Sequence, residues 1–169
     1  VYPGSDYRQK FGEGSYTNFG VYYNNRLNLG NNTEFYSFGG VNQRNGDAFA
    51  FTRDATSERN VVSIYPNGFN PQIKSNITDL SFATGIRSKF GVWNADFSVI
   101  TGSNRFEYDV HNTLNASLEA ASPTEFEAGG FKLSQHTLNA NFSRSFSKIA
   151  EGLNFAFGTE VRMEQYKIF

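Results

Sequence analysis

The 169-residue sequence contains no cysteine, and this absence removes a whole group of structures and chemistries. Without thiols there is no disulfide framework, no thiolate nucleophile and no zinc site of the thiolate kind. The chain also has one methionine, one tryptophan and four prolines, and its mean hydropathy is −0.49. No apolar run approaches the ~20 residues that a transmembrane helix requires. If the chain meets a membrane, it does so through strands.

Clustered charge of one sign is also missing. The 15 basic and 16 acidic residues nearly cancel to a net charge of −1, and the basic residues are scattered along the sequence. Nucleic-acid and anionic lipid surfaces are usually bound by basic residues that cluster. We therefore expect no nucleic-acid partner, and the sequence shows no electrostatic footprint for anionic lipid.

Aromatic residues are abundant, with 18 Phe and 9 Tyr, which is typical of β-structure. Apolar and polar side chains alternate with a period of two, most clearly from Leu153 to Met163, as expected for strands with two different faces. Arg144 is the exception on an apolar series, and it lies near a strand end where it can snorkel to water. The predicted strands lie near residues 16–28, 33–43, 77–90, 93–101, 133–146 and 153–168.

The connections between these strands alternate in length. Short turns follow Leu29, Phe90 and Phe146, whereas long loops are predicted over residues 44–76 and 102–132. Such long loops are uncommon in compact soluble domains, and outer-membrane barrels place short turns on one side and long loops on the other. Within the second loop, residues 112–121 predict one or two helical turns capped at Asn112. The predicted fold is an all-β, antiparallel up-and-down meander of about six strands from a transmembrane β-barrel.

Alternation alone also allows a soluble barrel or sandwich with its apolar residues inside. Two observations favour the membrane. The polar series is rich in Asn, Ser, Gly and Ala, which suits a filled or hydrated lumen better than a surface facing bulk water. The apolar series is almost free of charge over about five alternating positions per strand, and the strands reach the ~9–11 residues needed to cross a bilayer.

Several segments of the long loops and the strands beside them form a recognisable series: Ser63 to Ile73 (SIYPNGFNPQI), Asp79-Leu80-Ser81, Asn104-Arg105-Phe106, Asn112 to Leu118 (NTLNASL), Ser122 to Phe126 (SPTEF), Ala128 to Phe131 (AGGF), Gln135 to Asn139 (QHTLN) and Phe157 to Arg162 (FGTEVR). In this order, and over most of the chain from Phe35 onward, the sequence resembles TonB-dependent outer-membrane receptors.

This resemblance implies part of a plugged barrel in the bacterial outer membrane that imports a scarce nutrient of the siderophore, cobalamin or glycan class. It implies outer-membrane lipid as surroundings and a TonB energy complex as partner, reached through parts of the parent protein that this chain lacks. No plug domain and no secretion signal is recognisable, so we expect an internal fragment of the barrel. Because the two edges of such a sheet are unpaired, we expect it to self-associate through them, to stay in a larger assembly or to aggregate. An adhesin-type barrel without import is a further alternative.

No residue pattern indicates an enzyme, a cofactor or a metal. His111 and His136 lack ligand spacing, Glu119, Glu125 and Glu127 are best read as a solvated acidic loop, and no Gly-x-Ser-x-Gly elbow occurs. Binding residues usually lie on long loops held by rigid strands, and aromatic and amide side chains suit sugars, peptides or siderophores. The loop candidates for contacting a small-molecule or glycan substrate are Arg53, Arg59, Tyr65, Asn67, Phe69, Asn70, His111 and Asn112.

Overall fold

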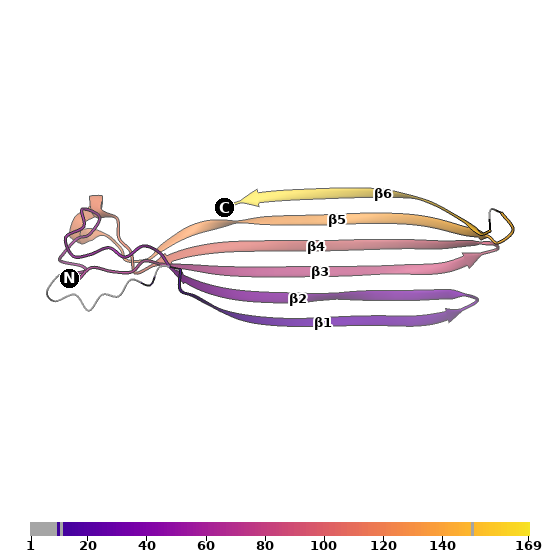
Figure 1. The fold of residues 1–169 in the computed structure, drawn as a ribbon, viewed down its shortest axis with the longest axis horizontal. Coiled ribbons are helices and arrows are strands. Elements are labelled where there is room, and N and C mark those ends of the chain that lie inside the picture. Colours follow the sequence, from indigo (N-terminus) through magenta and orange to yellow (C-terminus); the bar gives the residue numbers. More distant parts are fainter. Residues whose placement is uncertain (1–9, 11, 150) are drawn as a thin grey trace.

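The computed structural model, which describes residues 10, 12–149 and 151–169, is a single antiparallel sheet of six strands in sequence order (Figure 1). This confirms the predicted all-β meander, and the sheet is not closed. The three short turns lie at one end of the sheet and the two long loops gather at the other. The strands are β1 (Gly14–Gly30), β2 (Thr33–Phe49), β3 (Gln72–Phe90), β4 (Trp93–His111), β5 (Phe126–Phe146) and β6 (Leu153–Ile168).

Most strands continue further toward the loops than the alternation predicted. β2 and β3 stay paired as far as Phe49 and Gln72, and β4 and β5 as far as Val110 and Phe126. The long loops are therefore residues 50–71 and 112–125, shorter than the predicted 44–76 and 102–132.

The short turns use residues that accept a left-handed backbone. Gly30, Asn31 and Asn32 have φ values of 82°, 50° and 58°, and Gly91 has a φ of 60° at the first position of its two-residue turn. Glycine and asparagine tolerate this region better than other residues, and a first-position glycine suits a type II′ hairpin. These tight turns set the cross-strand register of each hairpin.

Following direct cross-strand partners gives a reference row that crosses all six strands. The row consists of Leu27, Phe35, Ile86, Phe97, Ala140 and Thr159. The last paired residue before each short turn lies two residues from this row in β2, four in β3 and six in β5. The line of turns thus slopes across the sheet by about one residue per strand.

Directly opposed residues project to the same side of a sheet, so the reference row defines one surface, which we call face A. In the turn half of the sheet, face A carries Val21, Leu27, Leu80, Val99, Leu138 and Val161, with exposures between 43% and 56%. Only Tyr36, Phe69, Ala83 and Ala95 are buried hydrophobic residues among those described. The described sheet is therefore one layer without a core, and its apolar surface is exposed.

The opposite surface, face B, is polar in the turn half, but the two faces exchange character toward the loops. There, face B carries Ile77, Phe106, Tyr108, Phe131, Leu133, Tyr166 and Ile168, while face A carries Asp47, Lys74, Arg105, Glu107, Asp109, Lys132 and Lys167. We call this part, residues 42–49, 72–78, 102–111, 126–134 and 165–168, the loop half. The alternation changes phase where the halves meet, which is why the predicted strands stopped near Gln43, Ile77, Thr101 and Leu133.

Candidate functional site

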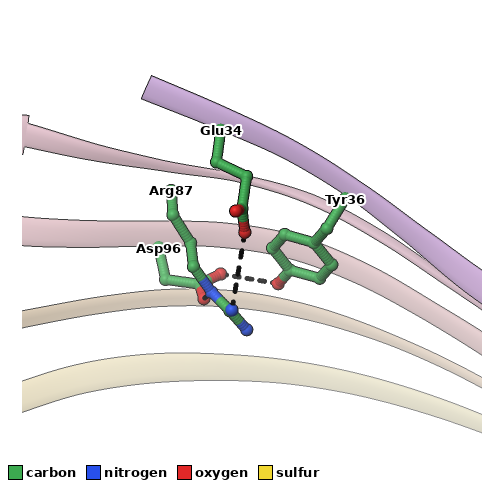
Figure 2. A network of polar contacts seen from close by, with 4 residues as sticks. All are labelled: Glu34, Tyr36, Arg87 and Asp96. Atoms are coloured by element: carbon green, nitrogen blue, oxygen red, sulfur yellow. Dashed lines mark hydrogen bonds and ion pairs between the residues drawn. The ribbon is translucent and has the colours of Figure 1, made fainter. Parts of the chain in front are cut away.

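The most developed polar cluster lies on face B near the short turns and joins β2, β3 and β4 (Figure 2). Arg87 Nε donates to Asp96 Oδ2 at 2.7 Å, and Tyr36 Oη donates to Asp96 Oδ1 at 2.8 Å. Glu34 Oε1 lies 3.9 Å from Arg87 Nη1, so the guanidinium lies between two carboxylates. Its central carbon also lies 4.3 Å from the centroid of the Tyr36 ring, a cation–π contact. We call these four residues the charged network.

The Tyr36 ring is positioned by a glycine on the next strand. A Cβ built on Gly85 would lie 2.5 Å from ring atoms of Tyr36 and 2.7 Å from the carbonyl oxygen of Phe97. Any larger residue at position 85 would displace the ring and separate its hydroxyl from Asp96. Tyr22 lies over Gly40 in the same way, with a built Cβ 2.3 Å from its ring. Face B thus uses the pairing of aromatic rings with glycines on neighbouring strands that stabilises curved sheets.

A hollow of about 770 Å³ adjoins the charged network. Its polar lining includes Glu34, Arg87, Asn94, Asp96 and Asn141, and Phe142 and Phe157 contribute apolar atoms. Charged and amide groups that offer both donors and acceptors suit hydrated or polar material. The hollow shows no group of carboxylate and histidine ligands; indeed, no cluster of three potential metal ligands occurs anywhere in the described part of the chain.

The first long loop, residues 50–71, is organised by its own contacts. Arg53 and Phe69 form two backbone hydrogen bonds of 2.8 and 2.7 Å, and the Tyr65 ring stacks on that of Phe69 with centroids 4.6 Å apart. Phe69 is 3% exposed, and Asn70 is buried and accepts a short hydrogen bond from the Thr52 hydroxyl. Four of the predicted substrate contacts, Arg53, Tyr65, Phe69 and Asn70, therefore lie in the packing of this loop.

The other predicted contacts lie in two different settings. Arg59 and Asn67 are exposed on the first loop. His111 Nδ1 lies 3.0 Å from Glu125 Oε1, and Asn112 Nδ2 donates to Gln72 Oε1 at 2.9 Å, so both stand at the base of the second loop. Tyr65 Oη reaches the Thr113 carbonyl at 3.4 Å, which joins the two loops. The structure brings the loops together without assembling all eight residues around one cavity.

The second loop contains the expected helical turn, but its cap is at another residue. A short 3₁₀ segment, η1 (Ala116–Ala121), is capped by Asn115, whose side chain accepts from the Ser117 amide at 3.1 Å. The prediction of a cap at Asn112 was wrong. Asn112 has a φ of 49° and follows the last residue of β4 rather than starting a helix. Asn115 in turn donates its backbone amide to the buried Ser122 hydroxyl at 2.7 Å.

The sequence reasoning missed the aromatic row of the loop half. Phe106, Phe131 and Tyr166, on three adjacent strands, form a series with centroid distances of 5.4 and 6.0 Å, and Tyr108 lies 4.4 Å from Phe106. On the opposite surface, face A, the hydrogen bond of 2.6 Å from Arg105 lowers the pKa of Glu107. A sequence signal for this row exists, because the charged residues Arg105, Glu107 and Asp109 alternate with Phe106 and Tyr108. This alternation has the opposite phase to that of residues 93–101, in which the odd-numbered positions are the apolar ones.

No protein-family model and no curated protein matches this chain. The interpretation of its function therefore depends on the geometry of the sheet and on the resemblance of its loop segments. Among the described residues, no helix is long and apolar enough to cross a membrane.

Proposed function

We propose that this chain is a sector of the wall of a transmembrane β-barrel in a bacterial outer membrane, from an importer of the TonB-dependent receptor type. Face A in the turn half would contact lipid, and face B would line the lumen. The observation that carries the proposal is a charge-poor apolar band on face A. From β2 to β6 this band shifts toward the turn end of the sheet, in the same direction as the line of short turns.

The slope of the band follows from the position of the first charged residue on face A of each strand. Counting from the reference row toward the loops, the first Asp, Glu, Lys or Arg on face A comes after 12 residues in β2 and β3 and after eight in β4, β5 and β6. A stagger of one residue per strand corresponds to strands tilted by about 35°, given a rise of ~3.3 Å per residue and a strand spacing of ~4.8 Å. Barrel strands in membranes tilt by a similar angle.

The height of the band also suits a bilayer. From Leu153 to Met163, β6 presents apolar side chains or Thr159 on face A over roughly 33 Å of strand, which at the tilt above spans about 27 Å. The apolar belt of outer-membrane barrels is about 25 Å high. A soluble sandwich or barrel would instead cover the same face along the whole strand, and the exchange of polarity in the loop half opposes that alternative.

The turn end of the band has the composition of an interfacial girdle. The ring of Trp93 lies 6.3 and 5.7 Å from those of Phe155 and Phe157, and Phe142 stacks on Phe157 at 5.3 Å. Arg144 is the single charged residue of the band within the six strands, and its guanidinium lies over the rings of Phe146 and Trp93 at 4.3 and 5.8 Å. Aromatic rings and a terminal arginine suit the boundary between lipid and water.

Import of a siderophore, cobalamin or glycan, driven by a TonB complex, is the part of the proposal supported by the loop resemblance. The charged network and its hollow would then face the lumen, and the two joined loops would stand at its outer opening. Energy-dependent uptake by cells that carry the parent protein tests import directly. Uptake that persists after the proton gradient is dissipated would instead favour a passive pore. No uptake under either condition would favour an adhesin.

The single tryptophan allows a direct test of membrane insertion. The chain is refolded into phospholipid vesicles, and fluorescence quenching by lipids brominated along the acyl chain is compared with quenching by aqueous acrylamide. Two variants move the fluorophore: Trp93→Phe with Phe97→Trp places it in the middle of the band, and Trp93→Phe with Tyr108→Trp places it on face B of the loop half.

We expect bromolipid quenching to be strongest for tryptophan at position 97, weaker at position 93 and near zero at position 108. Acrylamide should quench in the reverse order. Equal insensitivity of all three proteins to bromolipid, together with a monomeric folded state in detergent-free buffer, would show a soluble β module and overturn the proposal.

A further inference from the structure

Three cations that are far apart in the sequence lie side by side in the loop half of face A. Arg105 of β4 is directly opposite Lys132 of β5, and Lys132 is directly opposite Lys167 of β6. Like charges that face each other across adjacent strands destabilise a sheet. Arg105 has a carboxylate partner in Glu107 at 2.6 Å, whereas no carboxylate in the described part of the chain lies within 4.0 Å of either lysine ammonium. The row has an excess of positive charge that the described chain does not neutralise.

These side chains border a hollow of about 390 Å³, which Ser134, Gln165 and Phe169 complete. The Phe169 ring lies 4.6 Å from the guanidinium carbon of Arg105 and supports it from one side. Two ammonium groups, a guanidinium, a hydroxyl and an amide supply many hydrogen-bond donors, and no Asp or Glu side chain lines the pocket. A compact anion with several acceptor oxygens, such as a phosphate, is the complementary group.

The position of the hollow selects the source of that phosphate. Directly below it toward the turns, face A continues through Thr101, His136 and Met163 to Val99, Leu138 and Val161, which belong to the apolar band. A phosphorylated lipid has the same arrangement, with an anionic headgroup next to its acyl chains. A free anion would use only the cations, whereas a lipid would use the cations and the band together.

We propose that Arg105, Lys132 and Lys167 bind the phosphate headgroup of a membrane lipid whose acyl chains lie on the apolar band beneath them. The proposal rests on the proposed membrane-wall function and adds a lipid of stated chemistry to it. It also explains how scattered basic residues form an anion site that the sequence did not indicate: the strand register, and not the sequence spacing, brings them together.

The test uses the full chain refolded in maltoside micelles. Isothermal titration calorimetry compares three probes: short-chain phosphatidic acid, short-chain phosphatidylcholine and inorganic phosphate. We expect phosphatidic acid to bind most tightly, and both other probes at least ~10-fold more weakly, because each lacks either an accessible phosphomonoester or the acyl chains. The double variant Lys132→Gln and Lys167→Gln should lose about 10-fold or more in affinity for phosphatidic acid.

A matched variant separates a specific site from general positive charge. Lys74→Gln removes a cation from the same face of the loop half, on β3 and outside the hollow. It should leave the affinity unchanged, and Glu107→Gln should raise it because Arg105 is then released from its carboxylate partner. Equal loss with Lys74→Gln, or tight binding of inorganic phosphate alone, would overturn the lipid site.

The tryptophan experiment distinguishes this failure from that of the underlying proposal. If tryptophan at position 97 is quenched by bromolipid but the lysine double variant binds phosphatidic acid normally, the chain spans a membrane and the lipid site is wrong. If position 97 is not quenched, both proposals are wrong. Far-UV circular dichroism of each variant confirms that β-structure is retained.

Discussion

The turn half and the loop half of this sheet share the strands β2 to β6 but have opposite surfaces. Face A is apolar near the turns and charged near the loops, while face B changes from Asn, Gly and the charged network to the row of Phe106, Phe131 and Tyr166. The backbone is the same in both. In the proposed barrel wall, the difference follows from the surroundings of each half, because the side that avoids water changes where the surroundings change.

A charge placed on face A should have the largest effect on the free energy of unfolding, and it should have this effect only in the turn half. Ile86→Lys puts an ammonium in the middle of the band on β3 and should reduce the free energy of unfolding in lipid by about 2–4 kcal/mol. Asn76→Lys, on the same strand and face in the loop half, should change it by less than about 0.5 kcal/mol. Urea unfolding in vesicles measures both. Equal costs would mean that the two halves have the same surroundings.

Adding a methyl group on face B should also cost more unfolding free energy in the turn half than in the loop half, by a smaller amount. In Gly85→Ala the new methyl group collides with the Tyr36 ring and with the Phe97 carbonyl oxygen. The substitution should cost about 1–3 kcal/mol of unfolding free energy. Gly102→Ala in the loop half meets no heavy atom closer than the Leu80 carbonyl at 3.7 Å, so it should be nearly neutral. The same urea experiment measures both variants, and a neutral Gly85→Ala would show that Tyr36 is not held in this position.

The ion pair Arg87–Asp96 in the turn half should contribute more to the free energy of unfolding than the ion pair Arg105–Glu107 in the loop half. Asp96→Asn replaces the carboxylate shared by Arg87 and Tyr36 with a neutral amide that has one acceptor oxygen, and it should cost about 1 kcal/mol, because both donors lose a charged partner. Tyr36→Phe, which retains the Arg87 contact, should cost less. Glu107→Gln breaks the exposed pair with Arg105 and should leave the unfolding free energy nearly unchanged. A larger cost for Glu107→Gln than for Asp96→Asn would reverse this ranking.

The smallest effect is a pH dependence in the loop half. The Arg105 guanidinium lowers the pKa of the Glu107 carboxyl, so the stabilisation from this pair is complete above the ordinary glutamate pKa and is lost as the pH falls through the lowered one. Carboxyl chemical shifts measured by NMR between neutral and acid pH should place the Glu107 midpoint below the ordinary value. Arg105→Gln should return it toward that value, and an unchanged midpoint would exclude the pair as its cause.

The sequence predicted the meander because period-two alternation identifies strands, and the tight turns at Gly30 and Gly91 mark where they reverse. It could not predict the full strand lengths, because alternation around Thr101 and Leu133 changes phase and a change of phase looks like the end of a strand. The loop candidates were less predictable. Whether Phe69 or Asn70 meets a ligand or packs within its loop depends on their contacts with Thr52, Arg53 and Tyr65, which no local pattern encodes.

The stagger of the short turns has a consequence for any ring that includes this sheet. Each strand displaces the register by about one residue, so when the last strand of a ring meets the first, the total displacement equals the number of strands. A displacement by an odd number would place side chains of face A opposite side chains of face B, because facing alternates with every residue. A barrel that continues this stagger therefore has an even number of strands.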